Sequence, residues 1–272
     1  MESRDESTWV GTLDGLYHLN KELEGVASYG HDPENPDSLS RGWVLAIHED
    51  SAGALWVGTS GGGLNRLDPE TGRFRHYQHD PGSAGGLSDD TVNAIYEDSQ
   101  GRLWAGTDGG LHLYEPQVDT FRLYLAEGER PESGRAESIS AIVEDSGGTL
   151  WIGTWGNGLK RLDGEAGRSL TYHHNANDPR SLRTNFVSAI FEDSSGRLWF
   201  GTDAGLHLFD QVGGGFTHYG QSQGLQDEEI RAILEDRSGN LWVSTRLGLS
   251  RLDPEAGSFS NFDAGDGLVN RG

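Results

Sequence analysis

The sequence is organised by a tryptophan that returns at a nearly constant interval. Six tryptophans are separated by 47, 48, 47, 48 and 43 residues, and each stands in a phrase close to L-W-x-G-T. They are Trp9, Trp56, Trp104, Trp151, Trp199 and Trp242. A fixed period of this length is typical of repeat proteins, in which each unit buries its faces against its neighbours. Because no stretch interrupts the repeats, we expect one domain that spans residues 1–272.

Each repeat predicts four short strands. In the repeat around Trp104 these are an inner segment V-N-A-I-Y-E-D at 92–98, the tryptophan phrase, a segment that begins with Gly110-Leu111, and an aromatic segment at 121–124. Asp-Ser-x-Gly turns join the first two segments, because Asp bonds its own turn amides and Gly accepts a positive φ. Four-stranded antiparallel blades stacked side by side form a β-propeller. We therefore expect an all-β fold, a β-propeller of four-stranded antiparallel blades in which each tryptophan is a wedge between blades.

The phase of the repeat predicts that the first blade is incomplete. The first repeat begins at the tryptophan strand, so it lacks its inner segment. Near the other end, Gly267-Leu268 matches Gly224-Leu225, which places the next inner segment at residue 273. We expect five complete blades and one of three strands, in a fragment of a longer array. The ring either closes with six blades or is an arc of a larger propeller.

Composition limits the partners. The net charge is −22, from 21 basic and 43 acidic residues, and such a surface repels phosphate backbones, so we expect no nucleic acid. There is no cysteine, and the histidines have no metal-ligand spacing, so we expect no metal and no cofactor. No apolar run approaches the length of a membrane span, and the N-terminus carries no signal segment, so we expect no direct membrane insertion.

The repeated phrases resemble the two-component regulator propeller repeat. The stretch from Val92 to Leu111 matches that pattern almost throughout, and so does the stretch from Ile139 to Asp163. The resemblance implies the periplasmic or other extracytoplasmic sensor region of a membrane-bound regulator, often a hybrid histidine kinase. It implies that the remainder of the sensor kinase is a partner, that any kinase activity lies outside this chain, and that the ligand is a small molecule or an oligosaccharide.

Two tryptophans break the repeat register and are the first candidates for ligand contact. Trp155 lies in the loop between the second and third strands together with Asn157, and Trp43 stands directly before an inner strand. Loops on a rigid scaffold commonly carry binding residues, and an exposed aromatic face can stack on a sugar ring. The alternative is that Trp43 packs beneath the long loop that precedes it.

Charged residues in the same loops are further candidates. Arg246 could clamp a carboxylate or pair with a nearby Asp, while Asp108 and Asp203 could accept hydrogen bonds from sugar hydroxyls or serve their turns. Variable inner-strand positions could line the channel entrance; they are Asn93, Ser140, Ser188 and Arg231.

The leading functional interpretation is a non-catalytic, ligand-sensing propeller of a two-component regulator. The Glu-Asp pairs recur in five repeats, which favours a role in the turns over a catalytic dyad, and we predict no catalytic residue. One alternative is a propeller enzyme, either streptogramin-lyase-like or glycan-cleaving. Another is a structural module that makes a homodimer of the parent sensor.

Overall fold

The computed structural model describes residues 1–82, 85–124, 137–163 and 168–267. Its contacts divide the chain into two compact units, Met1–Ile142 and Val143–Gly272, and each is described by itself. The single domain over residues 1–272 stays a prediction. In the part of the chain that the structure describes, no helix is long and apolar enough to cross a membrane.

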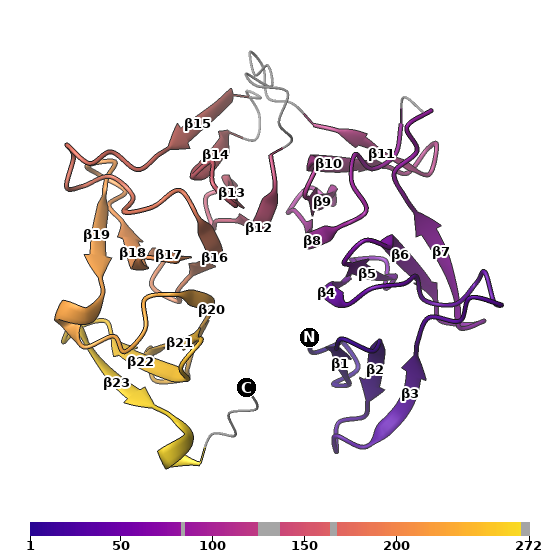
Figure 1. Cartoon of the computed structure of the whole chain (residues 1–272), viewed down its shortest axis with the longest axis horizontal. Coiled ribbons are helices and arrows are strands. Elements are labelled where there is room, and N and C mark those ends of the chain that lie inside the picture. Colours follow the sequence, from indigo (N-terminus) through magenta and orange to yellow (C-terminus); the bar gives the residue numbers. More distant parts are fainter. Residues whose placement is uncertain (83–84, 125–136, 164–167, 268–272) are drawn as a thin grey trace. The chain divides into compact units, whose positions relative to one another are not determined.

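The first unit contains a three-stranded sheet and two four-stranded sheets, all antiparallel between neighbours (Figure 1). The three-stranded sheet consists of β1 (Thr8–Gly11), β2 (Leu16–Leu19) and β3 (Gly25–Tyr29). The next consists of β4 (Val44–Glu49), β5 (Leu55–Thr59), β6 (Gly63–Asp68) and β7 (Arg73–Tyr77). The third consists of β8 (Val92–Glu97), β9 (Leu103–Thr107), β10 (Gly110–Glu115) and β11 (Thr120–Leu123).

The second unit contains three four-stranded sheets, the first of which begins with a strand that crosses the boundary, β12 (Ile139–Glu144). It continues with β13 (Leu150–Thr154), β14 (Leu159–Asp163) and β15 (Arg168–Tyr172). The next consists of β16 (Val187–Glu192), β17 (Leu198–Thr202), β18 (Gly205–Phe209) and β19 (Phe216–Tyr219). The last consists of β20 (Ile230–Glu235), β21 (Leu241–Thr245), β22 (Leu249–Asp253) and β23 (Ser258–Phe262). Two short 3₁₀ helices, η1 (Gln221–Gln223) and η2 (Ala264–Asp266), lie outside these sheets.

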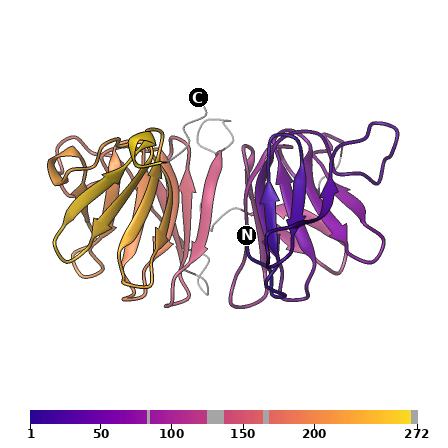
Figure 2. The ribbon, with the colours of Figure 1, turned by 90° about the horizontal axis from the view of Figure 1, so that it is seen from below.

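Every sheet follows the order of its strands in the chain, so the prediction of propeller blades is confirmed, including one blade of three strands. Within each unit the strands run between two faces (Figure 2). We call the face with the turns between first and second and between third and fourth strands the turn face. The opposite face carries the loops between second and third strands and the links to the next sheet, and we call it the loop face.

Among the residues that the structure describes, the inner edge of the three-stranded sheet is occupied by Met1 and Glu2. The Trp9 amide donates to the Met1 carbonyl at 2.8 Å, and Glu2 forms an isolated antiparallel bridge with Thr8. The predicted absence of a full inner strand from this blade is therefore confirmed.

The Asp of each Glu-Asp pair shapes its turn and fixes the tryptophan. In the β8–β9 turn, Asp98 Oδ1 accepts the amides of Gln100 and Arg102, while Oδ2 accepts the Trp104 indole N–H at 2.8 Å. Gly101 takes a φ of +73°, in the region that glycine enters without a steric penalty. The same indole-to-carboxylate bond recurs in the other four complete sheets. One short phrase therefore encodes both a turn and the orientation of a large core side chain.

Repeat tryptophans such as Trp56 and Trp151 pack between neighbouring sheets, as the sequence predicts. Trp56 is almost fully buried and contacts the rings of Tyr114 and Phe121, which belong to the next sheet. In every complete sheet the tryptophan also carries one guanidinium over its ring, 5.3–5.9 Å from the centroid. The arginine comes from the third strand in three sheets and from just before the second strand in two; the set is Arg66, Arg161, Arg251, Arg102 and Arg197.

The Glu of three of these pairs has a role that the sequence did not indicate. Glu97 Oε1 and Oε2 accept the hydroxyl and the amide of Ser51, both at 2.5 Å, from the turn of the preceding sheet. Glu192 and Glu235 bind Ser146 and Ser194 in the same way. The interpretation of these glutamates as turn residues was wrong, because their side chains link one sheet to the turn of its neighbour.

Candidate functional site

A pocket of about 380 Å³ opens on the loop face of the second unit. We call it the loop-face pocket, and it is lined by Trp155, Phe186, Ser188, Asp203, Glu229, Ile230 and Arg231. Two residues predicted for ligand contact, Trp155 and Asp203, thus lie in one pocket. Ser188 and Arg231, predicted to line the channel entrance, also lie in this pocket.

The backbone holds the two aromatic side chains of this pocket. Trp155 directly follows β13 and forms an isolated bridge with Phe186, which directly precedes β16. The amides of Gly156 and Gly158 donate to the Asn185 carbonyl at 3.0 and 2.9 Å. Gly158 has a φ of +80°, and a Cβ there would stand 2.2 Å from the Tyr172 carbonyl oxygen, so the loop requires glycine.

Both rings are nevertheless open to solvent. Trp155 is 46% exposed and Phe186 is 44% exposed, unlike the repeat tryptophan Trp151, which is buried. Burying an aromatic face against a ligand would remove this apolar area from water. The arrangement is suited to a flat or apolar ligand surface.

The polar side of the pocket contains two carboxylates and one guanidinium. Arg231 Nη2 lies 2.6 Å from Glu229 Oε1, which pairs these two charges. Asp203 makes no side-chain hydrogen bond or ion pair with the residues that the structure describes. Its carboxylate is therefore free to accept hydrogen bonds from a ligand.

Asp108 occupies the same repeat position as Asp203 but lies in a different environment. In the first unit, Asp108 Oδ1 accepts the Asn93 side-chain amide at 2.9 Å and the Ser138 hydroxyl at 2.6 Å. Asn93 Nδ2 also lies 3.0 Å from the Ile139 carbonyl, so it joins β8 to the next strand. This carboxylate already has partners within the protein, as the alternative structural interpretation expected.

The other predicted residues lie outside the loop-face pocket. Trp43 is 55% exposed, so it does not pack beneath its loop, and its carbonyl accepts the Ser60 amide at 2.9 Å. Asn157 is exposed and its amide donates to Thr154 Oγ1 at 3.0 Å. Arg246 Nε lies 4.0 Å from Asp227 Oδ2, which fits the alternative of pairing with a nearby Asp. Ligand contact by these residues stays a prediction.

Three residues that line the pocket were not predicted from the sequence: Ile230, the first residue of β20, and the two that precede inner strands. Phe186 and Glu229 each stand directly before an inner strand, in the repeat position that Trp43 occupies. Aligning that position across all repeats would have found them. The bridge of Phe186 to Trp155 required the structure.

Two buried histidines anchor the links beneath the loop face. His112 Nε2 accepts the Ser88 amide at 3.0 Å, and His207 Nε2 lies 3.3 Å from the Arg183 amide. Asn65 Oδ1 accepts the Ser40 amide at 3.0 Å in the same repeat position. Accepting an amide N–H requires the imidazoles to be neutral.

Burial stabilises this neutral state. It lowers the pKa of His112 to about 4 and the pKa of His207 to about 3. Both side chains are fully buried, so these histidines serve the scaffold and have no open path to a substrate. Within the described part of the chain, no group of three or more His, Cys, Asp or Glu side chains could hold a metal ion.

The two-component regulator propeller family matches the sequence five times, at residues 38–61, 86–109, 133–156, 181–204 and 224–246. Each match covers the end of a link, an inner strand and a tryptophan strand. The chain belongs to this family of repeat proteins. No protein with a curated description matches it in sequence.

Solved structures share the fold. The extracellular domain of a protein named as a hybrid two-component system of B. thetaiotaomicron matches with a TM-score of 0.79 and 22% identity, over 97% of this chain. This chain spans 34% of that domain. A second such domain, named as a one-component system of B. thetaiotaomicron, matches with a TM-score of 0.53 and 23% identity, over 96% of this chain and 40% of its own length.

An enzyme also shares the fold. Virginiamycin B lyase from Staphylococcus aureus matches with a TM-score of 0.70 and 16% identity, over 97% of this chain and 82% of the lyase. Identities this low show a common propeller architecture and leave function to be argued from the site.

Proposed function

We propose that this chain is a non-catalytic, ligand-sensing propeller region of a two-component regulator and that it functions outside the cytoplasm. The repeat family and the extracellular domains that share the fold support this role. The signalling output then belongs to the remainder of the sensor, which is its covalent partner. A homodimer stays a prediction.

The loop-face pocket carries the proposal. It combines two exposed aromatic rings with the unpaired Asp203 carboxylate and the Glu229–Arg231 pair. Sugars present an apolar C–H face that stacks on an aromatic ring and hydroxyls that donate to carboxylates. Two carboxylates against one guanidinium leave the pocket with a net negative charge, so we propose a neutral or amino-bearing saccharide as the ligand and expect acidic saccharides to be rejected.

Calorimetric titration of three disaccharides tests this proposal. The probes are maltose, which is neutral, chitosan disaccharide, which is cationic, and digalacturonic acid, which is anionic. We expect saturable binding of maltose or chitosan disaccharide and none of digalacturonic acid. Trp155→Ala should weaken the binding about tenfold, a loss of about 1.4 kcal/mol.

Matched variants locate the ligand. Asp203→Asn should weaken chitosan disaccharide more than maltose, because only the amine loses an ion pair, and Asp108→Asn should leave both affinities unchanged. A loss of binding in Trp43→Ala, with Trp155→Ala unaffected, would place the ligand on the first unit instead. Absence of saturable binding by all three disaccharides would refute a saccharide ligand at this pocket.

The lyase fold raises an enzyme as the second candidate. General acid–base catalysis needs a titratable group that reaches the substrate. His112 and His207 are fully buried, and burial keeps their pKa values far below neutrality. The titratable groups of the described part of the loop-face pocket are the Asp203 and Glu229 carboxylates; Glu229 pairs with Arg231 and no histidine accompanies them, which favours binding over catalysis.

A further inference from the structure

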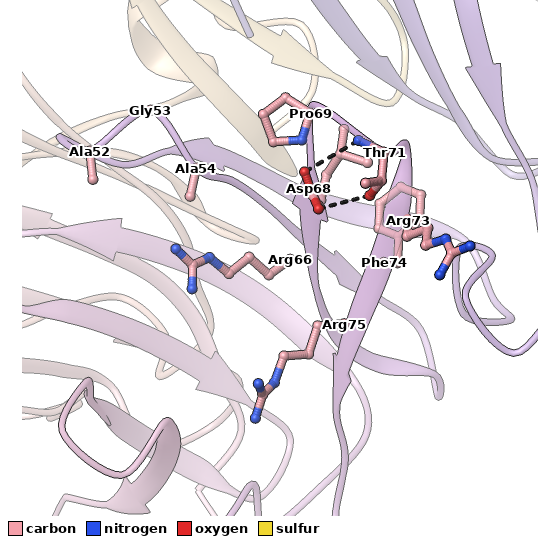
Figure 3. Close-up of a pocket in the computed structure, with 11 residues that line it drawn as sticks. Ala52, Gly53, Ala54, Arg66, Asp68, Pro69, Thr71, Arg73, Phe74 and Arg75 are labelled. Carbon is pink, nitrogen blue, oxygen red and sulfur yellow. Dashed lines mark hydrogen bonds between the residues drawn. The ribbon is translucent and has the colours of Figure 1, made fainter.

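A second hollow lies in the first unit, on the turn face of the β4–β7 sheet, and has a volume of about 620 Å³ (Figure 3). We call it the arginine hollow, after Arg66 of β6 and Arg75 of β7. In Figure 3 the side chains of Arg66 and Arg75 extend to the same side, whereas Arg73 extends away from them. The proposed sensing function does not use this hollow.

The strand register places two positive charges directly opposite each other. Arg66 pairs with Arg75 across the antiparallel β6–β7 ladder. Like charges directly opposite each other in this position destabilise a sheet. A cross-strand arginine pair therefore requires negative charge nearby, from the protein or from a bound anion.

The nearby carboxylates neutralise only part of this charge. Arg75 Nη1 lies 2.5 Å from Asp119 Oδ2, and Asp119 Oδ1 accepts the hydroxyls of Tyr77 and Tyr114 at 2.6 and 2.5 Å. Asp68 is occupied by the amide and hydroxyl of Thr71, as the dashed lines in Figure 3 show.

Arg66 shares the Asp119 carboxylate at longer range with Arg75, which holds it in an ion pair. The Arg66 guanidinium lies 5.3 Å from the centroid of the Trp56 ring, and it forms no ion pair or hydrogen bond with the residues that the structure describes. The Arg66 guanidinium can therefore donate several N–H groups, in a fixed planar arrangement that matches an oxyanion.

The other complete sheets do not contain this pair. Where the third strand carries arginine, the opposite residue is neutral: Arg161 faces Leu170 and Arg251 faces Ser260. In the remaining two sheets the third strand carries leucine at this position; the pairs are Leu113 with Arg122 and Leu208 with Thr217. The opposed arginines are thus particular to the β4–β7 sheet.

The space beside the arginines is also particular to this sheet. Ala54 precedes the second strand here, while the same repeat position carries Arg102, Thr149, Arg197 or Asn240 in the other complete sheets. Arg102 and Arg197 fold onto their turn carboxylates, with Nε 2.6 Å from Asp98 and Asp193. Ala54 leaves that volume empty and open to a ligand.

We propose that the arginine hollow binds a small oxyanion, with Arg66 and Arg75 as its principal ligands. Each guanidinium can donate two N–H groups to a sulfate, phosphate or carboxylate group. The net charge of −22 opposes anion binding at long range, but that field is screened beyond about 8 Å at physiological salt. Direct hydrogen bonds from the two arginines to the anion therefore decide the affinity.

Calorimetry with sodium sulfate, sodium phosphate and sodium acetate at constant ionic strength tests the proposal on the whole chain. We expect saturable binding with millimolar affinity for at least one of these anions. Binding of sulfate or phosphate would identify a site for a tetrahedral oxyanion, and binding of acetate would identify a site for a planar carboxylate. Arg75→Gln and Arg66→Gln should each weaken the binding at least fivefold.

Arg161→Gln is the matched control, because Arg161 occupies the strand position of Arg66 and covers Trp151 but faces a leucine. It should leave anion affinity unchanged. Arg66→Lys keeps the charge but loses the planar fork, so it should bind with intermediate affinity. Arg75→Gln leaves Arg66 in place over the Trp56 ring, so it still tests the proposal if the Arg66 variants fold poorly. Absence of saturable binding by the unmodified chain, or equal affinity in Arg75→Gln, would overturn the proposal.

Discussion

The loop faces above β9 and above β17 share one scaffold but differ in their surface chemistry. Beneath both, a buried histidine on the third strand accepts an amide of the link, His112 in one and His207 in the other. On the loop face itself, Asp108 accepts hydrogen bonds from Asn93 and Ser138. The residues at the two corresponding positions around Asp203 are Ser188 and Glu229. Ser188 directs its hydroxyl to the Ile230 carbonyl at 2.5 Å, and Glu229 cannot donate when ionised.

A repeat protein can thus form one site from many equivalent positions. Both loop faces keep the histidine contacts of the scaffold. Ser188 and Glu229 stand where Asn93 and Ser138 donate to Asp108, so the Asp203 carboxylate has no internal donor. An exposed aromatic pair beside that carboxylate completes the loop-face pocket.

The largest expected effect concerns the shared scaffold. For each histidine the folded pKa lies below the unfolded value of about 6.5, so its stability contribution is complete above that pH and is lost as the pH falls toward the folded pKa. From pH 7 to pH 5 the loss is about 2 kcal/mol for each histidine. Asn at this position, as at Asn65, makes the same hydrogen bond without titrating.

Urea unfolding at several pH values measures this difference. His112→Asn and His207→Asn should each flatten the acid side of the stability profile by about 2 kcal/mol at pH 5. Below pH 4 the effect of His207→Asn should continue to grow, because the pKa of His207 is about 3 and that of His112 is about 4. Identical profiles for the variants and the original chain would contradict the anchoring role.

The second-largest expected effect is a loss of ligand affinity when the surroundings of Asp203 are made like those of Asp108. The double variant Ser188→Asn, Glu229→Ser rebuilds around Asp203 the donors that surround Asp108. If the free carboxylate contacts the ligand, chitosan disaccharide should bind about tenfold more weakly, which calorimetry would measure. The mirror variant Asn93→Ser, Ser138→Glu on the first unit should leave that affinity unchanged. Undiminished binding by the Ser188→Asn, Glu229→Ser protein would exclude Asp203 as a contact.

The smallest effect concerns the stability of the two carboxylates. Asp108→Ala removes an acceptor from two donors on an exposed surface, so we expect a loss of about 1 kcal/mol. Asp203→Ala removes a group without an internal donor, so its effect should stay within about 0.5 kcal/mol. Thermal unfolding of the two variants compares them directly. Equal destabilisation would show that Asp203 has a structural partner after all.

Much of the fold could be predicted from the sequence because the same short pattern, which determines a turn and its strands locally, occurs in several repeats. The Asp98 turn, its glycine and the Trp104 indole bond lie within seven residues, and repetition separates this signal from chance. The incomplete first sheet followed from the same phase. The glutamate contacts did not, because Glu97 reaches a serine 46 residues away.

The candidate site could be predicted only in part. Trp155 stood out because it breaks the repeat register, and it does line the pocket, together with Asp203. Asp108 and Asp203 look alike in sequence, and the difference between them depends on donors from a neighbouring strand and link. Arg66 and Arg75 likewise become a pair only through the strand register.

The sequence by itself determined the blades of this protein, their order along the chain and the place of its tryptophans. These features depend on turns and periodicity, which act over a few residues. The tertiary structure decided which polar groups are already satisfied and which remain open to a ligand. That distinction depends on hydrogen-bond partners that come from different repeats. A pattern that repeats over a few residues does not specify those partners.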